Sequence, residues 1–216
     1  MFGLLGKKLG MSQIFTEEGT MVPVTIIQAG PCTVTQVRSK ERDGYEALQL
    51  GFEDKNRNVT KPLQGHFKRS GSVPKRHLRE FSPEPSIEAA EGATIKVDIF
   101  QQGELVDVRG VTKGRGFAGV VRRHGFGGGP ASHGHTSHRR VGSIGQSAFP
   151  SEVWKGKGMP GHMGHATRTV QNLKIVKVDG ERDLLYIKGA IPGPTGGIVE
   201  VRKAVKDRGK PTKGKS

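Results

Sequence analysis

The stretch VDVRGVTKGRG, residues 106–116, contains the change of pattern on which the fold depends. Its first four residues alternate apolar with charged side chains, which is the period of a half-buried strand. From Gly110 onward the alternation ends, and glycine and basic residues replace it. The boundary therefore divides the chain into strand-forming sequence and a segment of another kind.

Short apolar runs with a strand period occur on both sides of this boundary. They lie at residues 22–26, 45–52, 95–99, 169–178, 184–187 and 198–202. Joined by turns that contain Gly and Pro, such runs predict a mainly β chain that forms a small antiparallel barrel or sandwich. Asp179-Gly180 predicts a hairpin turn between two of them. Short helices are expected only near residues 61–69 and 86–90.

The two sets of strands are expected to form one domain. Residues 1–109 would supply the first part of a barrel and residues 170–205 the second part. Residues 110–169 would be inserted between them, with their base held by strands from both ends of the chain. Residues 206–216 are rich in Lys and Gly and predict a flexible basic tail.

The charge balance points to a polyanionic partner. The 216 residues include 35 Lys and Arg against 20 Asp and Glu, a formal charge of +15. Nucleic acid is the first candidate, because a globule this basic repels itself. A membrane surface is the weaker one, since no apolar run has the length of a spanning helix. No signal peptide is evident, and Cys32 is the only cysteine, so we expect a cytoplasmic protein without an intrachain disulfide.

The inserted segment is unlike the rest of the chain. Residues 110–164 contain 15 of the 33 glycines, and Glu152 is the only acid between Asp107 and Asp179. Six of the eight histidines also lie in this interval. Such a sequence cannot bury enough apolar surface to offset the entropy of ordering it. We therefore expect the segment to order on a nucleic acid.

Residues 114–119 contain the spacing G-x-G-x-x-G, which suggests a dinucleotide site. That site needs a helix within a strand-helix-strand unit and an acid about 20 residues further on. No acid follows before Glu152. The favoured interpretation is an RNA-binding backbone, in which glycines approach phosphates and nearby Lys and Arg side chains neutralise them.

His133, His135 and His138 have a spacing that could hold a metal ion. No carboxylate or cysteine lies nearby to complete or orient such a site, and a nuclease would need the same partner. Contacts to bases and phosphates fit these histidines better. A metal-dependent enzyme acting on RNA remains an alternative, and a free nucleic-acid chaperone is another.

Aromatic residues of the insertion have two interpretations each. Trp154 lies among Lys and Gly, so it either stacks on RNA or anchors the segment inside the protein, and Phe117 and Phe126 share these alternatives. No catalytic residue, metal ligand or cofactor is predicted. The predicted RNA-binding residues are Lys7, Lys8, Lys113, Arg115, Phe117, Arg122, Arg123, His133, His138, Arg139, Arg140, Gln146, Trp154, Lys155, Lys157, His162 and Arg168.

Several runs of the sequence resemble the bacterial large-subunit (50S) ribosomal protein L-three family. They are GLLGKKLGMSQIF at residues 3–15, TKGRGFAG at 112–119, SHR at 137–139, GSIGQ at 142–146, KGKGMPGHMG at 155–164 and KGAIPG at 188–193. The runs cover nearly the whole chain in order. They are much more specific than any single motif.

The resemblance implies a six-stranded Greek-key barrel, similar to that of translation factors, with an inserted finger that runs through rRNA toward the peptidyl transferase centre. It implies a non-enzymatic protein that binds 23S rRNA directly near its 3′ end, nucleates early assembly and contacts neighbouring large-subunit proteins. The tip of the finger would lie around Gln146 to Trp154. Some bacterial members carry a methylated glutamine where this chain has Ala148, so that modification is not expected here.

Overall fold

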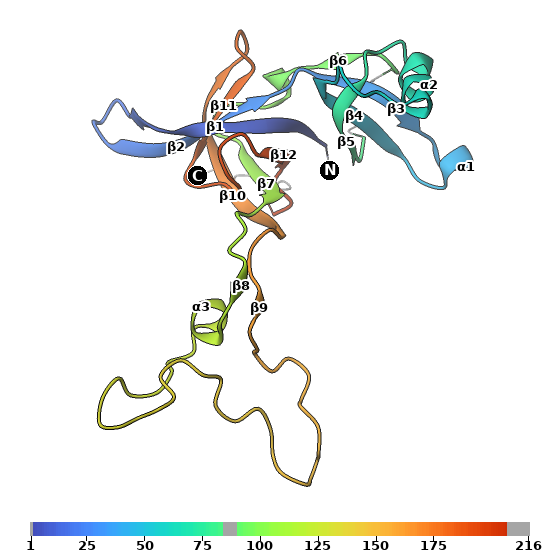
Figure 1. Cartoon of the computed structure of the whole chain (residues 1–216). Coiled ribbons are helices and arrows are strands. Elements are labelled where there is room, and N and C mark those ends of the chain that lie inside the picture. The colour runs from blue at the N-terminus through green and yellow to red at the C-terminus, as the bar shows by residue number, and fades with distance from the viewer. Residues whose placement is uncertain (1, 84–89, 207–216) are drawn as a thin grey trace, which may run out of the picture. The chain divides into compact units, whose positions relative to one another are not determined.

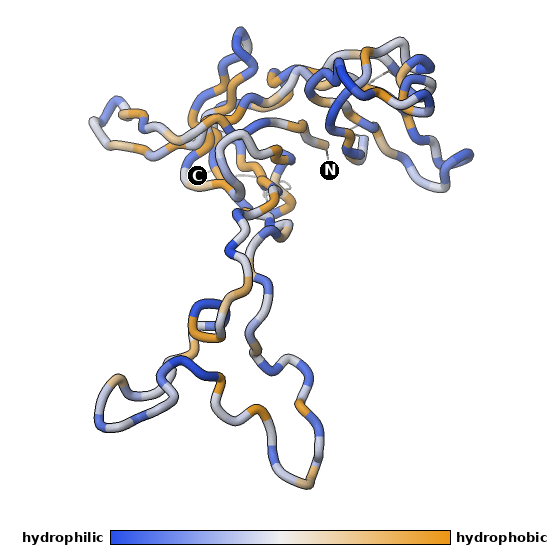
Figure 2. Tube along the Cα trace, in the orientation of Figure 1, coloured by the Kyte–Doolittle hydropathy of each residue, from blue (hydrophilic) through white to orange (hydrophobic). Residues whose placement is uncertain are grey.

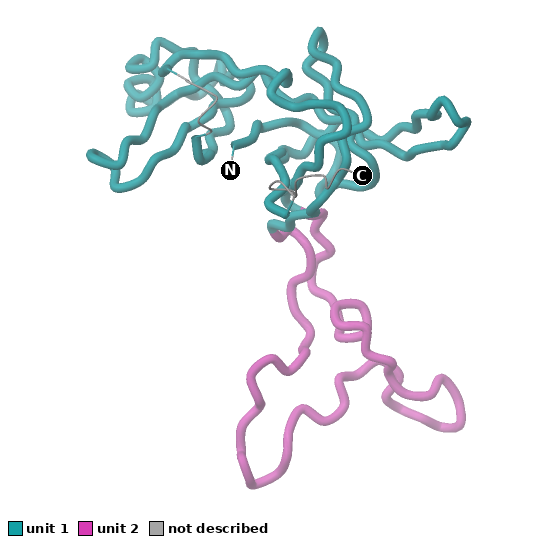
Figure 3. The backbone as a smooth tube through the Cα atoms, turned by 180° about the vertical axis from the view of Figure 1, so that it is seen from behind, with its two compact units in different colours: residues 1–111, 167–216 teal, residues 112–166 magenta. Residues whose placement is uncertain are grey.

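The computed structural model describes residues 2–83 and 90–206. The chain divides into two compact units, which Figure 3 shows in different colours. We call residues 1–111 with 167–216 the barrel unit and residues 112–166 the inserted unit. These limits lie two and three residues inside the predicted insertion, residues 110–169. Among the described residues, no helix is long and apolar enough to cross a membrane.

The strands of the barrel unit close a barrel in the order β1-β12-β7-β10-β11-β2, with every neighbouring pair antiparallel (Figure 1). The mainly β prediction is thus confirmed, and Asp179-Gly180 does begin the turn between β10 and β11. In chain order, the barrel strands are β1 (Gly3–Phe15), β2 (Met21–Ala29), β7 (Leu105–Val111), β10 (Thr167–Asp179), β11 (Leu184–Lys188) and β12 (Ile198–Lys203).

In β7 and β11 the alternating sequence buries the apolar side chains inside the barrel. Val106 and Val108 of β7 are fully buried and Arg109 is exposed. Asp107, between the two valines, is also buried, and its carboxylate accepts hydrogen bonds from the backbone N–H groups of Asn172 and Val205. Leu185 and Ile187 of β11 follow the same rule. Because the side chains of a strand alternate between its two faces, a period of two residues is what a barrel wall requires.

A second sheet lies outside the barrel, with the order β5-β4-β3-β6. Its strands are β3 (Cys32–Arg38), β4 (Ala47–Asp54), β5 (Lys75–Phe81) and β6 (Thr94–Ile95). Within residues 1–109, the predicted first part of the barrel, the strands β3 to β6 thus form a separate sheet in place of barrel strands. The apolar period of a strand reports that one face is buried, and it does not report against which sheet.

Residues 95–99, predicted as a strand, are one only in part. β6 ends at Ile95, and Val97–Ile99 forms a short 3-10 helix, η1. Ile95 and Val97 are both buried, so the pattern predicted the burial correctly and the backbone wrongly. A short 3-10 helix after a strand can thus bury alternate residues, here Ile95 and Val97, as a continuous strand would.

The remaining helices of the barrel unit are short. The predicted helix near residues 61–69 is confirmed as α2 (Lys61–Arg69), which begins with Pro62 in its first turn and buries Phe67. α1 (Lys40–Asp43), which was not predicted, ends at Gly44 in the left-handed conformation that glycine favours. The other predicted helix, residues 86–90, and the predicted basic tail lie almost entirely outside the described residues.

Ion pairs join the barrel to the second sheet. Glu200 of β12 accepts hydrogen bonds from Arg79 Nε of β5, at 3.1 Å, and from its neighbour Arg202 Nη2, at 2.6 Å. Lys7 Nζ of β1 lies 2.8 Å from Glu53 Oε1 of β4. Cys32 is buried between the same two layers, and its burial raises the pKa of the thiol to about 12. The thiol is therefore protonated at neutral pH and unreactive.

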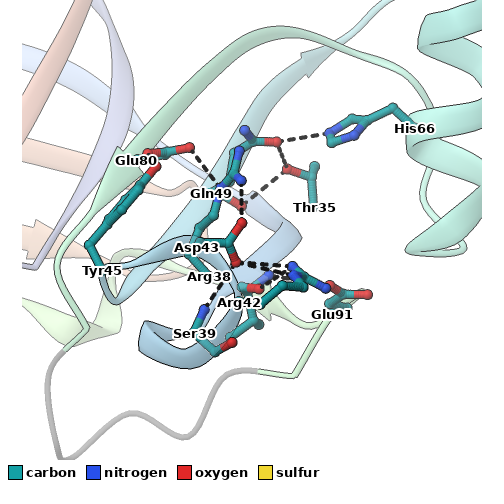
Figure 4. A network of polar contacts seen from close by, with 11 residues as sticks. Thr35, Arg38, Ser39, Arg42, Asp43, Tyr45, Gln49, His66, Glu80 and Glu91 are labelled. Carbon is teal, nitrogen blue, oxygen red and sulfur yellow. Dashed lines mark hydrogen bonds and ion pairs between the residues drawn. The ribbon is translucent and has the colours of Figure 1, made fainter.

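A network of polar contacts links α1 and the residues around it to the strands of the second sheet (Figure 4). Arg38 Nη1 donates to Asp43 Oδ1 at 2.6 Å, and this hydrogen bond holds the pKa of the Asp43 carboxyl below its usual range. Tyr45 donates its hydroxyl to Glu80 at 2.9 Å. The first contact connects α1 to β3, and the second connects the residues that follow α1 to β5. Side-chain contacts therefore hold this short helix in place.

Candidate nucleic-acid interface

The inserted unit begins and ends as a narrow ladder of backbone hydrogen bonds. Thr112 N–H donates to Ala166 O at 3.0 Å, and Arg115 N–H donates to Met163 O at 2.8 Å. The ladder continues into the two-residue strands β8 (Phe117–Ala118) and β9 (Gly161–His162), which pair antiparallel. Beyond them the chain forms two long loops, seen in Figure 1.

Glycine is required where the two sides of this ladder come closest. Gly164 has a φ of +75°, and a Cβ atom added there would overlap the carbonyl oxygen of Lys113. The positive φ disfavours other residues, and a side chain could fit only if the two sides of the ladder moved apart. The abundance of glycine in the sequence thus has a local cause at this position, in addition to any contact with a ligand.

A five-residue helix, α3 (Val120–His124), follows the G-x-G-x-x-G stretch. The sequence did not predict it. It is one turn long, and the strands beside it pair antiparallel, so it is not the helix of a dinucleotide-binding unit. Arg123 Nη1 and His124 Nε2 lie 2.7 Å and 3.0 Å from the carbonyl oxygen of Met159. These two basic side chains therefore brace the helix against the returning chain.

The first long loop contains the histidine-rich stretch and closes on itself. Gly129 N–H donates to His138 O at 3.0 Å, and His138 Nδ1 lies 2.7 Å from Pro130 O. The rings of His135 and His138 have centroids 6.0 Å apart. Nowhere in the described part of the chain do three His, Cys, Asp or Glu residues come together as metal ligands.

The second long loop exposes large apolar side chains. Trp154 is 67% exposed and Phe149 is 88% exposed, while Phe117, near the ladder, is 80% exposed. The alternative in which Trp154 anchors the inserted unit from within is therefore wrong. Phe149 was missed by the sequence analysis, although an aromatic residue in a loop with no apolar period was the signal that could have found it. Exposed aromatic rings are available for stacking on bases.

The inserted unit has almost no interior. Of residues 112–166, all of which the structure describes, only Ala118 and Val120 are buried. In Figure 2 the tube of this unit is mostly pale or blue, with short orange segments. A unit with so little buried apolar surface gains little stability from its own packing.

The cations of the inserted unit have no anionic partners within the described structure. Glu152, its one acid, forms none of the ion pairs found there. All the Lys and Arg side chains of the unit are exposed, and they are Lys113, Arg115, Arg122, Arg123, Arg139, Arg140, Lys155 and Lys157. His133, Gln146 and His162 are exposed in the same unit. The structure therefore gathers most of the predicted RNA-binding residues in one unit with excess positive charge.

Three of the predicted residues lie in the barrel unit instead. Lys8 is buried and donates through Nζ to Ile191 O and Gly193 O, both at 3.1 Å, which gives it a structural role. Lys7 forms the ion pair with Glu53 described above. Arg168, in β10, is exposed. A charged residue in a strand sequence does not reveal whether its partner is inside the protein.

The sequence is similar to known proteins along almost its whole length. A family model described as Ribosomal protein L3 matches residues 84–183. The "Large ribosomal subunit protein uL3" of Brachyspira pilosicoli is 50% identical over 211 residues, which cover 97% of each chain. The protein of the same name from Corynebacterium jeikeium (strain K411) is 56% identical over 206 residues, 94% of each chain. That of Herpetosiphon aurantiacus is 54% identical over 206 residues, 94% of this chain and 97% of the relative.

Proposed function

The chain belongs to the ribosomal protein L3 family, and we propose that the inserted unit is the part through which it binds 23S rRNA. It is a structural constituent of the large subunit of the cytoplasmic ribosome, and it is not an enzyme. Family membership replaces the two alternatives that the sequence left open, a metal-dependent enzyme and a free nucleic-acid chaperone.

One observation carries the proposal: the inserted unit presents eight exposed Lys and Arg side chains with no ion-pair partner in the described structure and has only two buried side chains of its own. Isolated charges of one sign repel each other, and a unit without a core cannot offset that repulsion. Phosphates of a folded RNA would neutralise these cations and order the loops at the same time.

The contacts would divide into two kinds. Lys and Arg side chains on phosphates fix the position of the protein and carry little sequence information. Exposed rings, above all those of Phe117 and Trp154, can stack on bases that the folded RNA leaves unpaired. Specificity would then come mainly from the shape of the RNA. Lys7 and Lys8 are not part of this proposal, because both have partners inside the barrel unit.

The barrel unit would act as the anchor on the rRNA near the surface of the subunit. Its neighbouring strands β12-β7-β10-β11 have the spatial order fourth-first-second-third, which supports a Greek-key barrel. By resemblance to the family, we extend the proposal to early assembly of the subunit. The same resemblance directs the loop that contains Gln146 to Trp154 toward the peptidyl transferase centre.

The test is the salt dependence of binding to 23S rRNA fragments. About eight phosphate contacts would lower the association constant by roughly 10³- to 10⁵-fold between 50 and 200 mM salt. The measurement is a plot of log association constant against log salt concentration for the purified full chain. A slope near zero would contradict the proposal, as would failure of the chain to sediment with large subunits at one copy per particle.

A further inference from the structure

The histidine-rich loop surrounds a pocket that the proposed function does not use. Its volume is about 530 Å³, and residues of the inserted unit alone line it. The residues that matter for its chemistry are Phe126, Gly128, Gly129, His135, Ser137 and Arg140. No acidic residue lines the pocket. An anionic or electron-rich ligand is therefore the kind that it can accept.

One wall of the pocket is bare backbone. Gly128 has a φ of +75°, and an added Cβ atom would overlap His138 O. At Gly129 an added Cβ atom would overlap the ring of His135 and lie 2.7 Å from Ser137 O. The two sides of the loop are thus as close as backbones allow, and the hydrogen bond from Gly129 N–H to His138 O fixes their spacing. These contacts define the shape of the pocket.

Hydrogen bonds fix the ring nitrogens of the two histidines in opposite states. Ser137 N–H donates to His135 Nδ1 at 3.2 Å, so Nδ1 carries no proton and the neutral ring donates through Nε2. His138 Nδ1 lies 2.7 Å from Pro130 O, and a carbonyl oxygen only accepts, so Nδ1 is the protonated nitrogen there. The ring of His135, which lines the pocket, therefore carries its hydrogen-bond donor at Nε2.

We propose that this pocket receives a single unstacked nucleotide of RNA. The base lies against Phe126 and the glycine wall, His135 Nε2 donates to an acceptor on the base edge, and Arg140 binds the adjoining phosphate. The space beside Gly127, which also lines the pocket, is open, so a flat base can approach the glycine backbone closely there. Arg140 is exposed and forms no ion pair in the described structure, so it is available to the phosphate. The inference rests on the proposed function, because the nucleotide would belong to 23S rRNA.

The first experiment locates the nucleotide. A photo-crosslinking phenylalanine derivative replaces Val141, which also lines the pocket, in the full chain bound to a 23S rRNA transcript. We expect crosslinks confined to the base of one unpaired nucleotide. Crosslinks scattered along the RNA backbone, or an absence of RNA crosslinks while the chain still binds, would overturn the proposal.

The second experiment tests the base contact with a matched pair of variants. That nucleotide is made abasic in a synthetic rRNA fragment, and affinities are measured for wild type, His135→Ala and His133→Ala. Removal of the base should weaken wild-type binding by roughly 5- to 150-fold, the range for loss of one stacked base. His135→Ala should lose about tenfold on the intact RNA, as for one hydrogen bond, and nothing further on the abasic RNA.

His133 is the control because it is exposed in the same loop and does not line the pocket. Any effect of His133→Ala should be the same on both RNAs. His135→Asn, which keeps a donor and an acceptor, should recover part of the affinity. Equal losses for His135→Ala on the intact and abasic RNAs would refute the pocket while leaving the proposed function in place. If wild type bound no 23S rRNA at all, both proposals would fall.

Discussion

The two units of this chain obtain their order in opposite ways. The barrel unit holds every ion pair of the described residues, and its apolar side chains form a core that continues from the barrel into the second sheet. The inserted unit holds exposed cations, exposed aromatic rings and two buried side chains. The difference teaches that charge has two uses in one sequence. In the barrel unit, where acids lie among the basic residues, ion pairs connect the strands. In the inserted unit, which has one acid, the basic residues are exposed and available to an external partner.

The largest expected effect comes from separating the two units. Residues 114–164 can be replaced by Gly-Gly, because His165 N–H already donates to Lys113 O and two glycines suit a hairpin turn there. We expect cooperative urea unfolding to persist, since the core lies entirely outside the deletion. Affinity for 23S rRNA should fall by at least about 1,000-fold at low salt, as the phosphate contacts are lost. A variant that no longer unfolds cooperatively would show that the inserted unit belongs to the core.

Two alanine substitutions compare how much one large side chain of each unit contributes to the free energy of unfolding. Leu185→Ala in the barrel should lower the free energy of unfolding by about 2–5 kcal/mol, because it leaves a cavity at a fully buried position. Phe117→Ala in the inserted unit should change it by less than about 0.5 kcal/mol, since that ring is exposed. Urea unfolding measures both. Similar losses for the two variants would break the distinction between the units.

A pair of glycine substitutions tests the ladder at the base of the inserted unit. Gly164→Ala and Gly156→Ala both place alanine at a positive φ, but only at Gly164 would the new methyl group overlap another residue, Lys113. Because the positive φ is common to both variants, the overlap alone should make Gly164→Ala bind rRNA roughly tenfold more weakly than Gly156→Ala, the effect of about 1–3 kcal/mol of overpacking. The thermal unfolding midpoint of the barrel should be unchanged in both. A lowered midpoint for Gly164→Ala alone would mean that the ladder stabilises the barrel as well.

The smallest effect concerns the Arg38–Asp43 contact at the edge of the second sheet. The pKa of Asp43 is lowered in the folded state by the hydrogen bond from Arg38. Its contribution to stability is therefore present above the ordinary carboxyl pKa of about 4 and is lost as the pH falls through the folded value. Wild type should exceed Asp43→Asn in stability at pH 6, and the gap should close as the pH is lowered from about 4 to 2. A constant gap over this range would assign the difference to something other than ionisation.

The sequence was sufficient for the parts of the fold that depend on alternation. Val106 and Val108, or Leu185 and Ile187, are buried as their period predicts. It was insufficient where strands with the same alternation pair with different neighbouring strands. The strands from Cys32 to Phe81 have a buried face like those of the barrel, yet they form their own sheet, because register and neighbours depend on contacts between residues far apart in the chain.

The candidate site was likewise predictable from the sequence only in part. The composition of residues 110–169 was enough to predict exposed cations, since a segment with a single acid and no apolar period can neither pair most of them nor bury them. What composition could not show is the arrangement of the backbone. The helix after Gly119, the overlap that requires glycine at position 164 and the opposite proton positions of His135 and His138 all arise from contacts across loops.

The insertion leaves the barrel from two strands that pair with each other, since Val111 of β7 lies opposite Thr167 of β10. Its ends are thus held together by the sheet, whatever lies between them. The entropy of closing a flexible loop grows only with the logarithm of its length, so doubling the insertion would cost roughly 0.6 kcal/mol. The length of the insertion, and with it the distance that it can reach, can therefore change with little effect on the stability of the barrel. Selection can lengthen or shorten the insertion to follow changes in the RNA while the barrel remains as it is.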